Sequence, residues 1–147
     1  MQNTGSGPSK EHVLVCLSSS PSNERIVRMA SKMARAFCAS FTALYVQTPE
    51  DAAMHTEDTS RLQANMRLAQ QLGAEIVTTH GEDVPTQIAE YVRLSDVTKI
   101  VIGRSGAQRR HFWSKQTLTE RLIELAPEVD IHIIPDAEAY KSYRRKR

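Results

Sequence analysis

Short apolar runs alternate with longer amphipathic segments along most of this sequence, and this alternation restricts the fold more than any other feature. Five runs rich in β-branched residues are predicted to be strands, at 12–17, 40–47, 75–79, 99–103 and 130–134. Strands that are apolar almost without interruption are typical of a parallel sheet covered on both faces. The pattern therefore predicts the order β-α-β-α-β-α-β-α-β with right-handed crossovers.

The predicted fold class is α/β: a three-layer α/β/α sandwich around a five-stranded parallel sheet, with the expected strand order 3-2-1-4-5. A length of 147 residues fits one domain. We expect that domain at 11–135, between a polar linker or cloning remnant at 1–10 and a basic tail or juxtamembrane linker at 136–147. The tail has five basic and two acidic residues, but the whole chain carries only +2, so its bulk charge does not call for a nucleic-acid partner.

Helix starts and stops have recognisable signals. Ser20 followed by Pro21 predicts an N-cap and a first helical residue, and Asp83 and Ser114 are expected to cap two later helices. The second helix is expected at 60–72, after a polar connection at 50–59, and Gly73 suits the residue that follows its end. The apolar faces of the four helices are expected to include Ile26, Met29, Ala30, Met33, Ala34 and Phe37; Leu62, Met66, Ala69 and Leu72; Ile88, Ala89, Val92 and Leu94; and Leu118, Leu122, Ile123 and Leu125.

The cysteines and the hydropathy pattern indicate the compartment. Cys16 and Cys38 each lie in an apolar stretch, which predicts two buried thiols in a reducing environment. No run approaches the roughly eighteen apolar residues of a membrane span, and the first ten residues do not resemble a signal peptide. We therefore expect a cytoplasmic domain.

A ligand of an open α/β sheet binds beyond the carboxyl ends of the strands, where the winding direction reverses. Here that position lies between the first and fourth strands, whose following loops are 18–20 and 103–106. Both loops have small or hydroxyl residues and lead toward helix starts, which attract anions. The second loop continues into cations and aromatic rings: Arg104, Arg109, Arg110, Phe112, Trp113 and Lys115. The alternative is structural: a cap, turn glycines, solvated cations and rings packed under the loop.

The topology, together with Gly103-x-x-Gly106, resembles the universal stress protein family, whose fold is that of the adenine nucleotide alpha hydrolase-like proteins. ATP-binding members of that family carry G-x2-G-x9-G-[S/T]. At the corresponding positions this chain has Gln116 and Thr117, so the hydroxyl is kept and the third glycine is not.

A more specific resemblance involves the first two strands. Ser18-x-Ser20, twenty intervening residues, and Phe41-Thr42-Ala43-Leu44-Tyr45 are similar to the S-x-S-x20-F-T-A-x-Y signature of the universal stress protein domain in KdpD-type sensor histidine kinases, in the branch that binds cyclic di-AMP. The resemblance covers about 10–135. It implies a cytoplasmic sensor domain of a membrane-bound kinase of potassium homeostasis, and a Lys/Arg-rich tail is expected beside a membrane span.

The two resemblances imply these ligand-binding residues: Ser18, Ser20, Phe41, Thr42, Ala43, Tyr45, Gly103, Arg104, Gly106 and Thr117. They imply cyclic di-AMP as ligand, with ATP as the alternative, and no required cofactor or metal. The implied partners are the other domains of the kinase, other universal stress proteins and a second copy in a homodimer. The sequence does not decide whether Arg109, Arg110, Phe112 and Trp113 contact the ligand.

Catalytic motifs are not found. The sequence has no GxxxxGK[ST], GxSxG or HExxH, and no histidine-kinase catalytic core. His12 and His132 fall in predicted strands and are expected to be structural. The sequence therefore favours a regulatory domain that binds cyclic di-AMP over two alternatives: a universal stress protein that binds or slowly hydrolyses ATP, and a protein-interaction domain with no small ligand.

Overall fold

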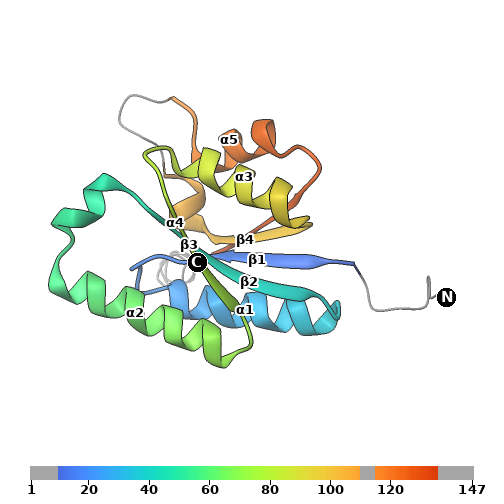
Figure 1. Ribbon diagram of the computed structural model, residues 1–147, viewed down its shortest axis with the longest axis horizontal. Coiled ribbons are helices and arrows are strands. Elements are labelled where there is room, and N and C mark those ends of the chain that lie inside the picture. Colours follow the sequence, from blue (N-terminus) through green and yellow to red (C-terminus); the bar gives the residue numbers. More distant parts are fainter. Residues whose placement is uncertain (1–9, 110–114, 136–147) are drawn as a thin grey trace, which may run out of the picture.

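The domain is built on one parallel sheet of five strands, as the alternating sequence pattern predicted. The computed structural model describes residues 10–109 and 115–135, so the expected linker and basic tail lie outside the described residues, apart from Lys10. The strand order is β3-β2-β1-β4-β5, and Figure 1 views the sheet nearly edge-on. The strands are β1 (His12–Cys16), β2 (Ser40–Gln47), β3 (Glu75–His80), β4 (Lys99–Gly103) and β5 (Asp130–Ile134).

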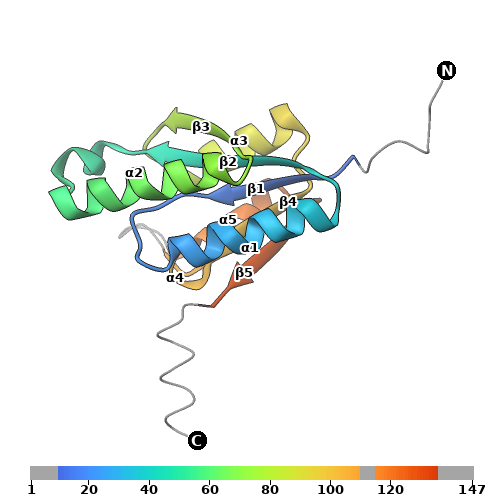
Figure 2. The same ribbon diagram turned by 90° about the horizontal axis from the view of Figure 1, so that it is seen from below.

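Helices cover both faces of this sheet and make the outer two layers (Figures 1 and 2). One face carries α1 (Asn23–Ala36) and α2 (Thr56–Gln71), and the other carries α3 (Val84–Ser95) and α5 (Leu118–Leu125). Two short elements, η1 (Pro49–Ala53) and α4 (Arg104–Ala107), follow β2 and β4 at the carboxyl edge. The predicted three-layer α/β/α fold with order 3-2-1-4-5 is thus confirmed.

The sheet separates two apolar cores. Val13, Val15 and Ala43 pack beneath α1 and α2, while Leu14, Leu44 and Ile100 pack beneath α3 and α5. Successive residues of one strand face opposite sides, and for β1 and β4 both sides are covered by helices. This explains why the sequence of these two strands is apolar without alternation.

Several helix boundaries and faces differ from the expectations. α1 begins at Asn23, two residues later than predicted, and α2 begins at Thr56, four residues earlier. Leu94 and Ile123 were expected on buried faces, but they are 79% and 56% exposed. Both predictions were wrong because the helices bury narrower stripes than the apolar spacing suggested. Gly73 follows the end of α2 with φ of +97°, as its predicted role requires.

Polar contacts tie the amino-terminal edge of the sheet together. The His12 ring donates from Nδ1 to the Ser95 carbonyl at 2.9 Å and accepts at Nε2 from Thr42 Oγ1 at 2.8 Å. The expected structural role of His12 is therefore confirmed. At the same edge, Lys99 pairs with Asp130 at 2.8 Å and lies 4.7 Å from the centre of the Phe37 ring. Among the described residues, no helix has the length and apolar character that crossing a bilayer would require.

Candidate functional site

A cavity of about 440 Å³ opens at the carboxyl edge of the sheet, where the chain leaves β1 and β4 toward helices on opposite faces. This volume falls within the range of small-molecule sites. Its floor is apolar and comes from both cores, with Ile26 on one side of the sheet and Leu44, Ile88 and Ile102 on the other. The position is the one that the winding reversal predicted.

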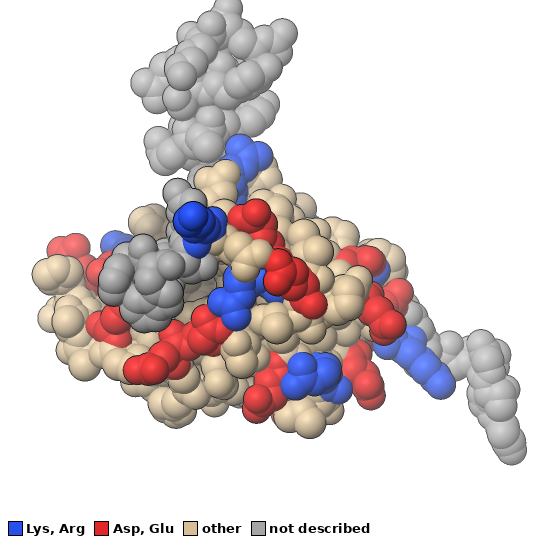
Figure 3. Space-filling model, turned by 90° about the horizontal axis from the view of Figure 1, so that it is seen from above, with Lys and Arg blue, Asp and Glu red and all other residues tan. Residues whose placement is uncertain are grey.

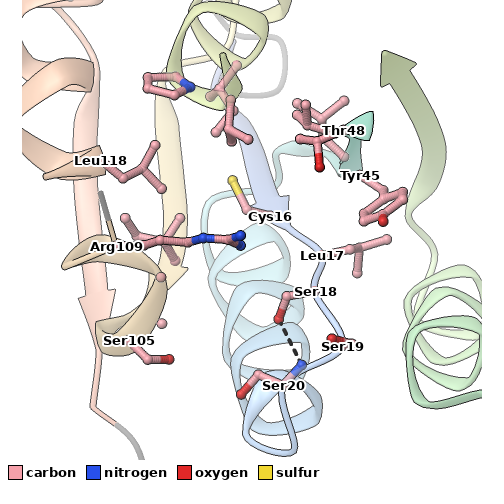
Figure 4. Close-up of a pocket in the computed structure, with 18 of the residues that line it drawn as sticks. Cys16, Leu17, Ser18, Ser19, Ser20, Tyr45, Thr48, Ser105, Arg109 and Leu118 are labelled. Carbon is pink, nitrogen blue, oxygen red and sulfur yellow. Dashed lines mark hydrogen bonds between the residues drawn. The ribbon is translucent and has the colours of Figure 1, made fainter. Parts of the chain in front are cut away.

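The loop after β1 forms one wall and is organised by its own hydroxyls. The Ser20 amide donates to Ser18 Oγ at 3.2 Å (Figure 4). The Ser22 amide donates to Ser20 Oγ at 3.3 Å. Ser18 and Ser20 both line the cavity. The prediction that Ser20 caps α1 was wrong, because Ser22 occupies the N-cap position. Ser20 instead closes the turn that leads into the helix.

The loop after β4 forms the facing wall. Gly103 ends the strand, and Gly106 lies in the four-residue helix α4. A Cβ atom added at Gly106 would meet no heavy atom within 4 Å beyond its chain neighbours and its own helix backbone, so the fold itself does not require a glycine there. Both glycines line the cavity. Because Gly106 has no side chain, the space beside it is open to a ligand.

Arg109 supplies a cation to this wall. Its side chain points from the end of α4 toward β1 and the serine loop (Figure 4). Its backbone is fixed, because the carbonyl accepts from the Leu118 amide at 2.7 Å and its amide donates to Gly106 at 3.1 Å. These bonds anchor Arg109 against the start of α5. Arg110, Phe112 and Trp113, whose roles the sequence left undecided, lie outside the described residues.

Tyr45 provides an aromatic ring on the opposite side of the cavity from Arg109 (Figure 4). Its hydroxyl donates to Asp51, whose carboxylate also accepts from the Thr48 amide at 3.0 Å. Burial, reinforced by the nearby Asp51 carboxylate, raises the pKa of Tyr45 above its ordinary value. Tyr45 is therefore a neutral ring whose orientation η1 holds in place.

Charges around the cavity are unevenly divided. Among the described residues, the cavity is lined by the four carboxylates of Glu50, Asp51, Glu82 and Asp83 and by the two guanidinium groups of Arg109 and Arg121. Arg121 is paired with Asp83. Acidic and basic side chains also lie interspersed over the face that carries α3 and α5 (Figure 3). An anionic group in the cavity is consequently favoured on the Arg109 side and disfavoured beside the carboxylates.

Five of the ten predicted ligand residues do not line the cavity. Thr42 and Ala43 are buried inside the sheet, and Phe41 packs against the core under α1 and α2. Thr117 caps α5 by accepting from the Glu120 amide at 3.2 Å, so Thr117 takes the role predicted for Ser114, which lies outside the described residues. Arg104 starts α4 but is not part of the lining. Ser18, Ser20, Tyr45, Gly103 and Gly106 are the five that meet there.

Three polar residues beside the first loop were not predicted from the sequence. Asn23, Arg61 and Asn65 all bond to the backbone between Cys16 and Ser19. Asn65 had a detectable signal, since it is an amide on the same face of α2 as Leu62 and Ala69. A buried amide needs hydrogen-bond partners.

The described residues support neither a metal centre nor a reactive thiol in the cavity. No group of three or more His, Cys, Asp or Glu side chains is placed to hold a metal ion in the part of the chain that the structure describes. Cys16 lies on the cavity floor, where the surrounding protein raises the pKa of its thiol to about 12. That thiol stays protonated near neutral pH and is a poor nucleophile. Cys38 is exposed, so the prediction that both cysteines are buried was wrong for Cys38.

Sequence comparisons identify relatives of this chain. The model of the universal stress protein family matches residues 10–127. Sensor protein KdpD of Clostridium acetobutylicum is 35% identical over 137 residues, which are 91% of this chain and 15% of the relative. Sensor protein KdpD of Escherichia coli K12 is 29% identical over 121 residues, 82% of this chain and 13% of the relative. The chain therefore spans about one seventh of the length of each of these two relatives.

Solved structures share the architecture. A universal stress protein crystallised in complex with cAMP superimposes with a TM-score of 0.62 at 19% identity, covering 84% of this chain and 95% of that protein. Universal stress protein UspA from Lactobacillus plantarum gives a TM-score of 0.59 at 22% identity, over 86% of this chain and 99% of that one. A universal stress protein from Archaeoglobus fulgidus in complex with dAMP gives 0.52 at 19% identity, over 86% and 97%. At these identities the likeness establishes the fold.

Proposed function

Since this chain belongs to the universal stress protein family, we propose that it is a cytoplasmic sensing domain of a KdpD-type sensor histidine kinase. In this proposal it binds cyclic di-AMP in the cavity beyond β1 and β4 and modulates signalling in potassium homeostasis. The remaining domains of the kinase are the proposed partners. The two relatives from Clostridium acetobutylicum and Escherichia coli named KdpD, which this chain matches over 15% and 13% of their length, support a role as one domain of a larger protein.

The observation that carries the proposal is the meeting of Ser18, Ser20 and Tyr45 with Gly103 and Gly106 around one cavity. The serines and the tyrosine belong to the S-x-S-x20-F-T-A-x-Y signature, and the glycines belong to the Gly103-x-x-Gly106 motif. Two motifs separated by more than fifty residues thus contribute to the same site. Adenine nucleotides bound by the universal stress proteins of similar fold, cAMP in one and dAMP in another, support the same ligand class.

The distribution of charge suggests how a cyclic dinucleotide lies in the cavity. Ser18 Oγ already accepts from the Ser20 amide, so its hydroxyl proton is left to donate to a phosphate oxygen. Arg109 offers a charge-assisted donor from the facing wall. Tyr45 offers a ring for a base, a contact worth about 1–3 kcal/mol. The carboxylates near Tyr45 suit the amino group of adenine and the hydroxyls of ribose, and they keep the phosphates on the Arg109 side.

ATP is the main competing ligand. Gln116 lines the cavity at the position where ATP-binding members carry their third glycine, and its side chain fills space that a glycine leaves open. Thr117 is engaged as a helix cap. We therefore expect cyclic di-AMP to bind at least about tenfold more tightly than ATP, a difference of roughly 1.4 kcal/mol.

Calorimetry of the purified domain with cyclic di-AMP, ATP and AMP tests the proposal. The matched variants are Arg109→Gln and Arg104→Gln, which remove the same charge from the two ends of one short segment. We expect Arg109→Gln to lose about 1.5–3 kcal/mol of affinity for cyclic di-AMP and Arg104→Gln to retain it. Tighter binding of ATP would identify an ATP-binding protein, and no binding of any of the three would favour a protein-interaction domain.

A further inference from the structure

The backbone of the serine loop is held from α2 by two side chains one helical turn apart. Arg61 donates from Nη1 to the Ser19 carbonyl, and Asn65 donates from Nδ2 to the Ser18 carbonyl, each at 2.9 Å. Arg61 also pairs with Asp58 at 3.0 Å on the same helix, which orients its guanidinium. Consecutive carbonyls of the loop are thus bound to residues i and i+4 of one helix, which lie on the same face.

Asn65 has little other reason to occupy its position. It is 5% exposed, and its neighbours on that face of α2 include Leu62 and Ala69, which are buried in the apolar core. An amide in such surroundings is unfavourable unless it is hydrogen-bonded, whereas a leucine would add apolar burial. The hydrogen bond from Asn65 to the Ser18 carbonyl offsets the cost of burying the amide.

A second amide, at the start of α1, holds the same loop. Asn23, which is 2% exposed at the start of α1, accepts from the Ser18 amide and donates to the Cys16 carbonyl, each at 3.2 Å. Both backbone groups of Ser18 are therefore bound to buried asparagines. This leaves its side chain as the group that faces the cavity, with its position fixed on both sides.

We infer that Arg61 and Asn65 are positioning residues that hold the Ser18–Ser20 loop in its ligand-binding conformation. The inference rests on the proposed function, since it assigns these residues a part in binding the cyclic dinucleotide. Neither residue lines the cavity. They act through the loop, and they connect the site to α2, a helix that contributes no residue to the cavity lining.

The first experiment compares Arg61→Met with Arg67→Met. Arg67 is exposed on the same helix, so each variant removes one positive charge and keeps an unbranched side chain. We expect Arg61→Met to weaken cyclic di-AMP binding about tenfold and Arg67→Met to change it less than twofold. The difference should persist in 1 M salt, where charges act over only about 3 Å. Equal affinities of the two variants would overturn the inference, because Arg61 would then have no special effect on binding. A difference that salt abolishes would also overturn it, because the difference would then reflect the lost charge alone.

Amide exchange of residues 17–22 without ligand is the second measurement. Arg61→Met should speed exchange in this segment at least about fivefold, and Arg67→Met should leave it unchanged. Asn65→Leu should have the same effect as Arg61→Met while the melting temperature shows that the variant remains folded. If the wild-type domain binds no cyclic dinucleotide, the proposed function fails, while the exchange data still decide whether these residues hold the loop. Unchanged exchange in both variants would overturn the inference.

Discussion

Arg121 on α5 donates two parallel hydrogen bonds to the carboxylate of Asp83, which immediately precedes α3. They run from Nη1 to Oδ1 at 3.1 Å and from Nη2 to Oδ2 at 2.9 Å. The pair links two helices that cover the same face of the sheet, and both residues line the cavity. Asp83 occupies the N-cap position of α3, as predicted, but its carboxylate accepts from Arg121 and from the Thr86 hydroxyl.

Because of this ion pair, the free energy of unfolding should depend on pH in the acid range. The hydrogen bond from Arg121 holds the pKa of Asp83 below its ordinary value of 3.8. A lowered pKa stabilises the fold above 3.8 and loses that contribution as the pH falls through the lower folded-state value. Because the Asp83 side chain is 43% exposed, we expect Asp83→Asn to cost only about 0.5–1 kcal/mol at pH 7. Urea unfolding at pH 7 and near pH 3 measures this, and the difference from wild type should shrink at the lower pH. Glu82→Gln, one residue earlier, is the matched control, and an equal loss there would contradict the prediction.

Gly106→Ala tests whether this glycine is needed for ligand binding or for the stability of the fold. Alanine suits a helix better than glycine, and a Cβ there meets no heavy atom within 4 Å beyond its chain neighbours and its own helix backbone. We expect stability to be unchanged or to rise by up to about 1 kcal/mol, while cyclic di-AMP affinity falls at least about fivefold. Gly73→Ala is the opposite control: its φ of +97° should cost about 1 kcal/mol of stability without changing affinity. Retained affinity in a folded Gly106→Ala protein would remove this residue from the site.

Thr117→Ala should affect folding and leave binding intact. Thr117 and Glu120 form a reciprocal capping box at the start of α5, with bonds of 3.2 and 2.8 Å. Loss of the cap typically costs about 1 kcal/mol. Thr117→Ser should restore the stability because serine caps equally well. Thermal melting and calorimetry give the two readouts. A loss of affinity with no loss of stability would return Thr117 to the ligand-binding residues that the family resemblance implies.

The two cysteines should differ in reactivity. Cys38 is exposed, whereas burial raises the pKa of Cys16 to about 12. Iodoacetamide at pH 8 should therefore modify Cys38 in the folded protein and reach Cys16 only in denaturant. Mass spectrometry of peptides from wild type and from Cys38→Ser follows each thiol separately. Modification of Cys16 at a rate near that of Cys38 would contradict the prediction, because the reagent would then reach the thiol on the cavity floor in the folded protein.

The sheet could be predicted from the sequence because each strand carries its own signal. Val13–Val15 and Ile100–Ile102 are buried on both faces, and only a covered parallel sheet accepts such runs. The location of the cavity follows from topology alone. The ends of helices were predicted less well, because several hydroxyl residues compete there: Ser20 and Ser22 are two residues apart, and the chain geometry decides between them.

The lining of the site was only partly predictable. A sequence motif contains residues that build a strand together with residues that reach the ligand, and Thr42 and Ala43 are of the first kind. Ser18 and Tyr45 reach the cavity because they lie near the carboxyl ends of their strands. Arg61 and Asn65 lie more than forty residues after the loop that they hold. Local pattern cannot reveal a contact between distant segments, although an amide on an apolar helix face indicates that some partner exists.

The apolar floor of the cavity belongs to two cores that the sheet otherwise keeps apart. Ile26 comes from the core under α1, while Ile88 and Ile102 come from the core under α3. Any molecule that fills the cavity is thus packed against both layers, and its binding free energy is added to the stability of each. Opening either layer by local unfolding would expel it. A saturating ligand would accordingly merge two separate opening reactions into a single cooperative one, and the outer helices on opposite faces would lose their amide protons at a common rate.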